Sequence, residues 1–558
     1  DEEGYLIHVG DQIVIDAPAY TGLLYGGVSI SQILYQDEMH ARVPKGIIRD
    51  YPEYSVRGGM HDVARKYFSL DYIEEMGRYM AWFKLNTLHL HINEDSGLGG
   101  EYSSSFVVES KKYPQLNTYN GEYVWSQDDY RQMQKDLKKV GIDVVTEIDT
   151  PGHATIFQLI DPEIVNGSNF DLSNHYDECL ALIEDVFDEF LDGEDPVFQN
   201  AVVHIGTDES ANTNENMRRY INDLAQYCLA KDNIDEVYFW GNLSLYYGFN
   251  EIDPDHVAAQ VWDSADQRVD EALASGFDVI NSTSNSLYLI PGNANGLHNG
   301  YVDMSTFYET WDGVTDFDTN RQSNPSYISN RNYYCAYDLL LGDPQILGAI
   351  YCNWNDRSWA NDFDVLDLMI SYIGVVSEKT WYGDSDRFDS GADFVQAFEA
   401  VGDRAPDVNP RRIVDTDSDI IARYQFDEMN EGTIEDQEND YDLQTDGTLV
   451  QRDETNGNAL RLDGASLHAP FEAVGYPYTV SFDLYLDGEQ PEDAILFQDE
   501  YCTFYLNDQG RGVGFQIGKY GMSFNASIPE NEWVNVKITS MYQHGGSAVT
   551  TLIINDEM

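Results

Sequence analysis

Two adjacent carboxylates at the end of an apolar segment are the residues in this sequence most suited to chemistry. They are Asp208 and Glu209, in the stretch HIGTDES that begins at His204. Adjacent acidic groups repel each other, and burial raises the pKa of at least one of them. A carboxyl group with a raised pKa can donate a proton near neutral pH. The alternative is a solvated acidic loop, which is common in so acidic a chain.

Two further stretches combine polar groups of useful types. EIDTPGHA, at positions 147–154, places Asp149 and His153 on either side of a Thr-Pro-Gly turn. A capped strand-to-helix turn would explain this pattern equally well. SVRGGMHD contains Arg57 and Asp62 in one apolar segment. An arginine can donate two parallel hydrogen bonds to sugar hydroxyls, and an ion pair inside a barrel is the alternative.

Aromatic residues follow several of the apolar segments. Aromatic rings at such positions can form walls for the apolar faces of a sugar. Taken one at a time, each ring is equally compatible with the hydrophobic core. The set is Trp240, Trp262, Tyr288, Trp311, Trp354 and Trp359.

Eight strand-like apolar segments within residues 46–385 alternate with helical patterns, and together they predict the fold. They are YSVRGGMHD, LNTLHLHIN, GIDVVTEID, AVVHIGTDE, EVYFWG, HVAAQVWD, FDVINSTS and ILGAIYCNW. Eight such units predict an α/β fold, the (β/α)8 TIM barrel. Active-site groups of this barrel lie at the C-terminal ends of its strands. The unusual residues Asp62, His91 and Asp149, with the Asp208–Glu209 pair, stand at those ends.

The flanking segments have other patterns. Residues 1–45 read as a hairpin and a helix, the end of a small N-terminal α/β domain that packs on the barrel. Residues 386–418 predict a helix and a linker. Residues 419–558 are short alternating strands with turns, which predict an all-β sandwich that the end of the chain truncates. Because the chain starts abruptly at Asp1, we expect a processed segment of something longer.

Charge and cysteine content limit the partners. Acidic residues outnumber basic ones by 98 to 32, which gives a net charge of −66. Such a charge repels nucleic acid and anionic membranes but tolerates a neutral ligand such as a sugar. No apolar run is long enough to span a bilayer. The five cysteines show neither zinc spacing nor a disulfide framework, so we expect no metal.

Together these segments resemble glycoside hydrolase family 20, the β-N-acetylhexosaminidases and lacto-N-biosidases, over residues 1–385. The family signature H-x-G-x-D-E stands here as His204, Gly206, Asp208 and Glu209. The other matching positions are Arg57, Asp62, Arg65, Asp149, Pro151, Gly152, His153, Trp240, Trp262, Tyr288 and Trp354. The order of so many elements is far more specific than any one motif.

The resemblance implies a retaining, substrate-assisted hydrolase that removes β-linked N-acetylhexosamine from the non-reducing end of glycans. In this family the substrate's own acetamido group replaces an enzyme nucleophile. Glu209 would be the acid/base, Asp208 would hold the acetamido N–H, and Tyr288 would bind the acetamido oxygen. The other expected substrate-binding residues are Arg57, His153, Trp240, Trp262, Trp354 and Asp356. Asp149 and His204 would support the catalytic pair from behind.

The same resemblance sets expectations for partners and location. No metal or organic cofactor is required. The substrate would be the glycan of a glycoprotein, a mucin or a milk oligosaccharide. The C-terminal sandwich resembles concanavalin and laminin-G-like modules, which often bind glycans. We expect a bacterial extracellular protein, secreted or attached to the cell surface.

Two departures from the family pattern leave alternatives open. The usual aspartate-rich end of the second strand is Asn93-Glu94-Asp95 here. The usual W-G-E after the last strand is WND, ending at Asp356, whose carboxylate is one methylene shorter. With the segment 293–334, this could admit a larger unit, as in a lacto-N-biosidase that releases Gal-β1,3-GlcNAc. A carbohydrate-binding or adhesion protein with an inactive barrel is another alternative, against which the intact Asp-Glu pair weighs.

Overall fold

The computed structural model divides the chain into two compact units, one built mainly from Asp1–Val408 and the other from Asn409–Gln543 with Ser547–Met558. The residues it describes are 2–37, 39–94, 106–118, 123–241, 248–263, 269–291, 302–313, 343–356, 362–383, 387–409, 411–416, 418–453, 457–471, 473–491, 494–499, 502–517, 520–543 and 547–555.

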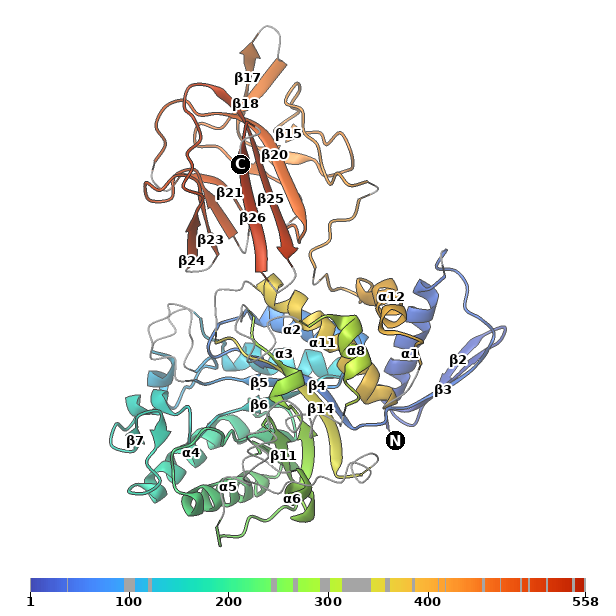
Figure 1. Cartoon of the computed structure of the whole chain (residues 1–558), viewed down its shortest axis with the longest axis vertical. Helices are drawn as coiled ribbons and strands as arrows, with labels where there is room; N and C mark the ends of the chain where they lie inside the picture. The colour runs from blue at the N-terminus through green and yellow to red at the C-terminus, as the bar shows by residue number, and fades with distance from the viewer. Residues whose placement is uncertain are drawn as a thin grey trace. The chain divides into compact units, whose positions relative to one another are not determined.

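Eight parallel strands close into a barrel in the first unit (Figure 1). In spatial order they are β12 (Asp278–Asn281), β11 (Val257–Val261), β10 (Glu236–Trp240), β9 (Val202–His204), β6 (Asp143–Glu147), β5 (Thr87–His91), β4 (Val56–Asp62) and β14 (Ile346–Asn353). Pairing of β12 with β14 completes the ring. A short strand, β13 (Tyr288–Leu289), pairs with the end of β14. The predicted TIM barrel and its eight strands are confirmed.

Helices surround these strands. They are α2 (Leu70–Trp82), α3 (Gln127–Lys139), α4 (Tyr176–Leu191), α5 (Asn214–Leu229), α6 (Val269–Ala274), α7 (Ser284–Leu287), α8 (Met304–Thr310) and α11 (Asp362–Tyr382). Shorter elements lie between them: η1 (Pro114–Asn117), η2 (Thr155–Leu159), β7 (Val165–Asn166) and β8 (Asn169–Phe170). Ser69, Ser126 and Thr213 cap α2, α3 and α5 by accepting a backbone N–H. Among the described helices, none is both long and apolar enough to cross a membrane.

The N-terminal segment forms a three-stranded antiparallel sheet with a helix beside it. The sheet order is β2 (Ile13–Asp16), β1 (Tyr5–Val9) and β3 (Gly46–Asp50), and α1 (Tyr20–Tyr35) connects β2 to β3. The predicted hairpin and helix are confirmed. The predicted boundary at residue 45 falls one strand too early, because β3 pairs with β1. The helix predicted after residue 386 is α12 (Gly391–Gly402), whose Gly391 N–H donates to Glu309 next to α8.

The second unit is all-β. Its strands are β15 (Thr433–Ile434), β16 (Leu443–Thr445), β17 (Thr448–Asp453), β18 (Gly457–Arg461), β19 (Leu467–His468), β20 (Tyr478–Tyr485), β21 (Ile495–Gln498), β22 (Cys502–Tyr505), β23 (Gly514–Ile517), β24 (Tyr520–Ser523), β25 (Trp533–Gln543) and β26 (Ser547–Ile554). Phe504 of the sheet β21-β22-β23-β24 shares a core with Val536 and Leu552 of the sheet β20-β25-β26. Two sheets that share one core form a sandwich, as predicted.

Candidate active site

The parallel order of the strands brings distant residues together at one end of the barrel. Asp208 and Glu209 follow β9, and Asp149 with His153 follows the neighbouring strand β6. Arg65 follows β4, and that strand pairs with β5 and β14. Because parallel strands present their C-terminal ends on the same face, segments far apart in the sequence meet around one opening.

The turn that holds the two carboxylates is tightly constrained. Thr207 and Glu209 have positive φ angles, +93° and +45°, and such angles are uncommon for residues with side chains and concentrate at functional sites. A Cβ atom on Gly206 would lie 1.9 Å from Oδ1 of Asp149, so only glycine fits there. The backbone N–H of Thr207 donates to the same Oδ1 atom (3.1 Å). Asp149 therefore fixes the position of this turn, which agrees with its predicted supporting role.

The carboxyls of Asp149 and Asp208 have raised pKa values. Burial raises the pKa of Asp208. Burial and the charge of Asp208 raise the pKa of Asp149 well above its usual range. Two buried acids so close resist full ionisation, so the pair retains a proton at a pH where a free carboxyl would lose it. The prediction that burial raises at least one pKa in the Asp208–Glu209 pair is confirmed for Asp208.

Glu209 has a different environment from its neighbour. Its side chain is 60% exposed, compared with 11% for Asp208. Nε2 of His153 lies 3.5 Å from its Oε2 atom, and this partner lowers the pKa of Glu209. Burial opposes the charged form of His153, but the surrounding carboxylates outweigh burial and raise its pKa well above the usual value. The ligand-free site therefore pairs an imidazolium with an accessible carboxylate.

Arg65 and Asp356 form the rim of the site on the β4 and β14 side. Arg65 donates to Asp62 (2.9 Å) and pairs with Glu94, and its guanidinium carbon lies 5.2 Å from the ring centre of Trp354. Its Nε atom is 3.9 Å from the half-exposed carboxylate of Asp356. Asp62 also accepts the backbone N–H of Asn355 (3.0 Å), next in sequence to both Trp354 and Asp356. Asp62 thus fixes both sides of this rim.

Arg57, which the sequence suggested as a substrate ligand, lies elsewhere. It is the second residue of β4, at the N-terminal end of the strand, and it is completely buried. Its guanidinium binds Glu3 with two hydrogen bonds of 2.8 Å and lies 5.0 Å from the ring centre of Trp381. Arg57 therefore attaches the N-terminal segment to the barrel. Arg65, eight residues further along the chain, is the arginine that the fold brings to the site.

Three of the predicted aromatic residues line one side of the opening. Tyr288 stacks on Trp262 at 6.2 Å and 13°, and its ring centre is 5.7 Å from that of Trp354. Trp240 lies 5.8 Å from Trp354 but has no exposed surface, and its indole N–H donates to Glu147 (2.5 Å). Trp240 therefore supports Trp354 from below, where we had expected it to contact a sugar directly. Trp311 stacks on Phe307.

Sequence reasoning missed a polar cluster inside the barrel, centred on Glu147. Its Oε2 atom lies 3.0 Å from Nε2 of His89 and 2.9 Å from Nδ1 of His91. His204, predicted as a support for the catalytic pair, stacks on His89 and lies 3.5 Å from Oε1 of Glu147. The alternation HLH in β5 and TE in β6 was the available signal, because residues two apart in a strand share a face.

Histidine and carboxylate groups inside the barrel are also close enough to share a cation. One such group is His89, Glu147 and His204, whose ligand atoms lie within 4.8 Å of one another. His89 and Glu147 already hydrogen-bond each other, so the contacts within this group need no ion to explain them.

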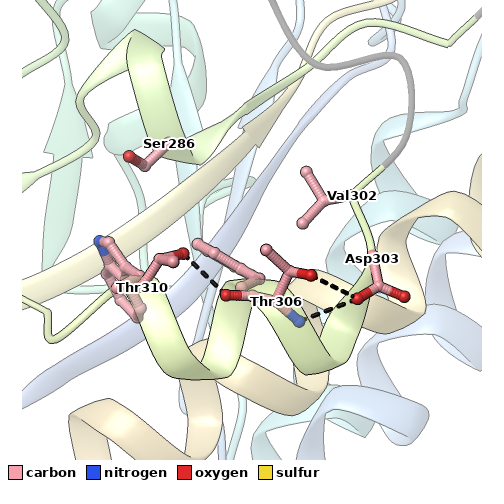
Figure 2. A pocket seen from close by; sticks show the side chains of 7 residues that line it. Ser286, Val302, Asp303, Thr306 and Thr310 are labelled. Atoms are coloured by element: carbon pink, nitrogen blue, oxygen red, sulfur yellow. Dashed lines mark hydrogen bonds between the residues drawn. The ribbon is translucent and has the colours of Figure 1, made fainter. Parts of the chain in front are cut away.

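A separate open pocket lies between α7 and α8, with an empty volume of about 620 Å³ (Figure 2). Its hydroxyl and aromatic lining includes Ser286, Thr306 and Trp311. Asp303, at its edge, accepts hydrogen bonds from the N–H and the hydroxyl of Thr306. None of the predicted catalytic residues lines this pocket. Of the segment 293–334, which we expected to shape the substrate pocket, the structure describes only residues 302–313, and Trp359 also lies outside the described residues.

Comparisons with known proteins agree on one family. Residues 54–383 match the model of the glycosyl hydrolase family 20 catalytic domain, and residues 1–51 match domain 2 of that family. Beta-hexosaminidase 1 of Coccidioides posadasii is 26% identical over 449 residues, 68% of this chain and 70% of that protein. The lacto-N-biosidase of Bifidobacterium bifidum is 22% identical over 510 residues, 84% of this chain and 40% of that protein.

Solved structures give the same fold. The crystal structure of the β-N-acetylhexosaminidase from Bacteroides fragilis aligns with a TM-score of 0.58 and 23% identity, covering 73% of this chain and 82% of that one. The β-N-acetylhexosaminidase from Streptomyces coelicolor aligns with a TM-score of 0.55 and 22% identity, covering 73% and 84%.

Proposed function

Because this chain belongs to glycosyl hydrolase family 20 and is a glycosidase of the β-N-acetylhexosaminidase type, we propose that it removes a terminal β-linked N-acetylhexosamine by a retaining, substrate-assisted mechanism. One observation supports this most strongly. Oδ1 of Asp208 is buried and makes no hydrogen bond within the described part of the chain, whereas the adjacent Glu209 is accessible. An enclosed polar atom suits a substrate amide, and an exposed carboxyl suits proton exchange with a leaving group.

In the first step, Glu209 gives its proton to the glycosidic oxygen as the bond from that oxygen to the anomeric carbon breaks. The carbonyl oxygen of the acetamido group attacks the anomeric carbon and forms an oxazolinium ion, with Asp208 accepting the acetamido N–H. In the second step, Glu209 takes a proton from water while the water oxygen attacks the same carbon and reopens the ring. Two inversions at one carbon give overall retention.

The ground state described above does not yet have the acid protonated, because His153 lowers the pKa of Glu209. A bound sugar excludes water from the exposed side of Glu209, and desolvation raises the pKa of a carboxyl. Substrate binding is therefore the event that prepares Glu209 to donate. Arg65 and Asp356 are the groups that we assign to the terminal hydroxyls, in place of Arg57.

Glu209→Gln tests the acid/base assignment. We expect kcat/KM for a chitobiose-type substrate, whose leaving group needs protonation, to fall about 10²–10⁴-fold. A p-nitrophenyl glycoside should lose less, because its leaving group needs little assistance. Glu215→Gln is the matched control, since Glu215 lies in the first turn of α5 and accepts backbone N–H groups from Phe249 and Asn250. A near-normal rate of Glu209→Gln on the chitobiose substrate would remove Glu209 from this role.

Release of a disaccharide is a second candidate, favoured by the open position of Asp356. Its carboxylate is 48% exposed and lies 3.9 Å from Arg65, which leaves it free to bind a more distant oxygen. We would compare kcat/KM for p-nitrophenyl GlcNAc and p-nitrophenyl lacto-N-bioside. A site that binds a terminal sugar through polar groups discriminates strongly, because those groups are otherwise unpaired. Preference for the disaccharide would reassign the protein as a lacto-N-biosidase.

Extracellular location and glycan binding by the C-terminal sandwich stay predictions of the sequence.

A further inference from the structure

Glu147 is a carboxylate at the end of β6 that is completely buried and yet fully engaged. It faces the ring nitrogens of His89 (3.0 Å) and His91 (2.9 Å), and it accepts the indole N–H of Trp240 (2.5 Å). A buried carboxylate is costly to keep unless several donors surround it. Here the donors come from two different strands, β5 and β10, so that one side chain connects the floor beneath Trp354 with the histidines of β5.

A chain of alternating acidic and basic groups continues from Glu147 to the catalytic turn. Nε2 of His91 lies 3.3 Å from Oε2 of Glu94. Oε1 of Glu94 lies 2.6 Å from Nδ1 of His153, and Nε2 of His153 lies 3.5 Å from Oε2 of Glu209. Each contact joins a carboxylate oxygen to a ring nitrogen, which gives the order Glu147, His91, Glu94, His153, Glu209.

The geometry fixes the protonation of His91. Its two ring nitrogens each face a carboxylate oxygen, Nδ1 toward Glu147 and Nε2 toward Glu94. A neutral imidazole has only one N–H, so both contacts can be hydrogen bonds only if His91 is an imidazolium. Burial opposes this charge, but Glu147 and Glu94 outweigh burial and raise the pKa of His91 well above the usual value.

We propose that Glu147 is a positioning residue for the acid/base step: it holds His91 as an imidazolium and thereby, through Glu94 and His153, sets the orientation and proton affinity of Glu209. The proposal rests on the acid/base role of Glu209 proposed above. The chain also explains why β5 presents two histidines to the interior, since a single donor would leave an oxygen of Glu147 without a strong partner.

Other charged or titratable groups face this chain and belong in the reasoning. Glu94 also pairs with Arg65, which in turn binds Asp62. The remaining neighbours are His89 on β5, Asp149 after β6, His204 and Asp208 on the β9 side, and Cys352 on β14. None of these contacts changes directly when Glu147 becomes Gln, except those of His89 and His204.

Glu147→Gln should neutralise His91. An amide offers one oxygen and one NH2 group to the donors that now meet two carboxylate oxygens, so at least one N–H would face the NH2 group. His91 can resolve this clash by releasing its Nδ1 proton and accepting from the amide. The lost pair of charges includes a positive charge that is closer to Glu209 than the negative one. The pKa of Glu209 should therefore rise, and the alkaline limb of the kcat/KM profile should move to higher pH.

The size of the effect should resemble that of other supporting groups around a reaction centre. We expect kcat/KM at the optimum to fall about 10–100-fold, the range found when the outer partners of functional histidines are removed. Glu147→Asp keeps the charge and should keep the limb at its wild-type pH, with a smaller loss of rate. This rescue by the conservative variant separates the charge of Glu147 from its volume.

Glu236→Gln is the matched control for a merely structural effect. Glu236 is also a strand carboxylate of the barrel, at the beginning of β10, and burial raises its pKa to about 7. It lies at the opposite end of the barrel from the site, so its loss should alter Tm without moving the limb. Should Glu147→Gln fail to fold, His91→Gln removes the imidazolium directly and should move the limb in the same direction.

The proposal is overturned if Glu147→Gln and His91→Gln leave the alkaline limb in place and lose activity only in step with Tm. It is also overturned if Glu236→Gln moves the limb equally. Failure of the underlying function would look different: the limb would then persist in Glu209→Gln, which tests the acid/base independently of Glu147.

Discussion

Asp208 and Glu209 are neighbours in the chain, but their surroundings give them opposite properties. Asp208 is enclosed beside Asp149, and burial raises its pKa. Glu209 is exposed beside a charged His153, which lowers its pKa. Enclosing two carboxyls together stores an unfavourable energy in the folded protein. Active sites commonly sacrifice stability in this way, so the residue most needed for chemistry is also one that weakens the fold.

Asp208→Asn should therefore stabilise the protein while inactivating it. Asp149 and Asp208 have folded-state pKa values above their unfolded values, so wild-type stability is greatest below about pH 3.8 and declines as pH rises through the raised pKa values. The amide removes that decline. We expect a gain of about 1–3 kcal/mol at pH 7, the usual cost of an unsatisfied buried polar group, and a vanishing gain near pH 4. Urea unfolding at both pH values measures it; a loss of stability at pH 7 would contradict the prediction.

The two arginines of β4 and its following loop show where residue-level prediction stopped. Arg57 and Arg65 both stand in the family motif, and the sequence offers no sign of which one reaches the site. The deciding fact is position along the strand, because seven residues at about 3.3 Å each separate the two ends of a strand by roughly 20 Å. Arg57 begins the strand, and Arg65 follows its C-terminal end. Glu94, His91 and Glu147 were missed as a group because their contacts run between strands.

At the scale of elements, the barrel was predictable because each strand is an apolar run that ends in polar or aromatic residues. All eight runs became strands, in parallel neighbours. The boundary at residue 45 was not predictable in the same way. β3 has mostly exposed residues and belongs to the N-terminal sheet only through its pairing with β1, and pairing between segments 40 residues apart leaves no local pattern.

Arg57→Met should separate this connection between elements from catalysis. Arg57 joins β4 to the N-terminal segment through Glu3 and lies over Trp381. Removing one partner of a buried ion pair typically costs about 3–5 kcal/mol, so the free energy of unfolding should fall by that order while kcat/KM below the transition is unchanged. Unfolding by urea and a rate assay at 15 °C measure both.

Arg65→Lys is the opposite case, because lysine keeps the charge but loses the planar fork that binds two oxygens. We expect KM for the glycan to rise at least tenfold, with little change in Tm. If Arg57→Met raised KM and Arg65→Lys did not, the assignment of the two arginines would be reversed.

At the scale of the whole molecule, the charge of −66 is the dominant feature. Like charges on a compact surface repel, and salt screens that repulsion with a Debye length of about 10 Å at 0.1 M and about 3 Å at 1 M. Exposed carboxylates therefore weaken the folded state most at low ionic strength. Adaptation to a saline environment and simple solubility are both compatible with this composition.

We predict that Tm rises as KCl is increased from 0.1 M to 1 M at pH 7. The dependence should be weaker at pH 5, which is nearer to the isoelectric point of about 4.1, because fewer carboxylates are charged. Differential scanning calorimetry at both pH values tests this. A Tm that falls with KCl at pH 7 would show that specific ion pairs outweigh the general repulsion.

The most direct test of the proposed mechanism removes the acetamido group from the substrate. The wild-type protein would be assayed with p-nitrophenyl β-GlcNAc and p-nitrophenyl β-glucoside, which differ only at that group. Without the acetamido oxygen there is no nucleophile in the proposed mechanism, so kcat/KM for the glucoside should be lower by about 10³-fold or more, the range in which loss of one essential catalytic group falls. Comparable rates on the two glycosides, with a covalent glycosyl-enzyme trapped from the glucoside, would contradict substrate-assisted catalysis by this chain.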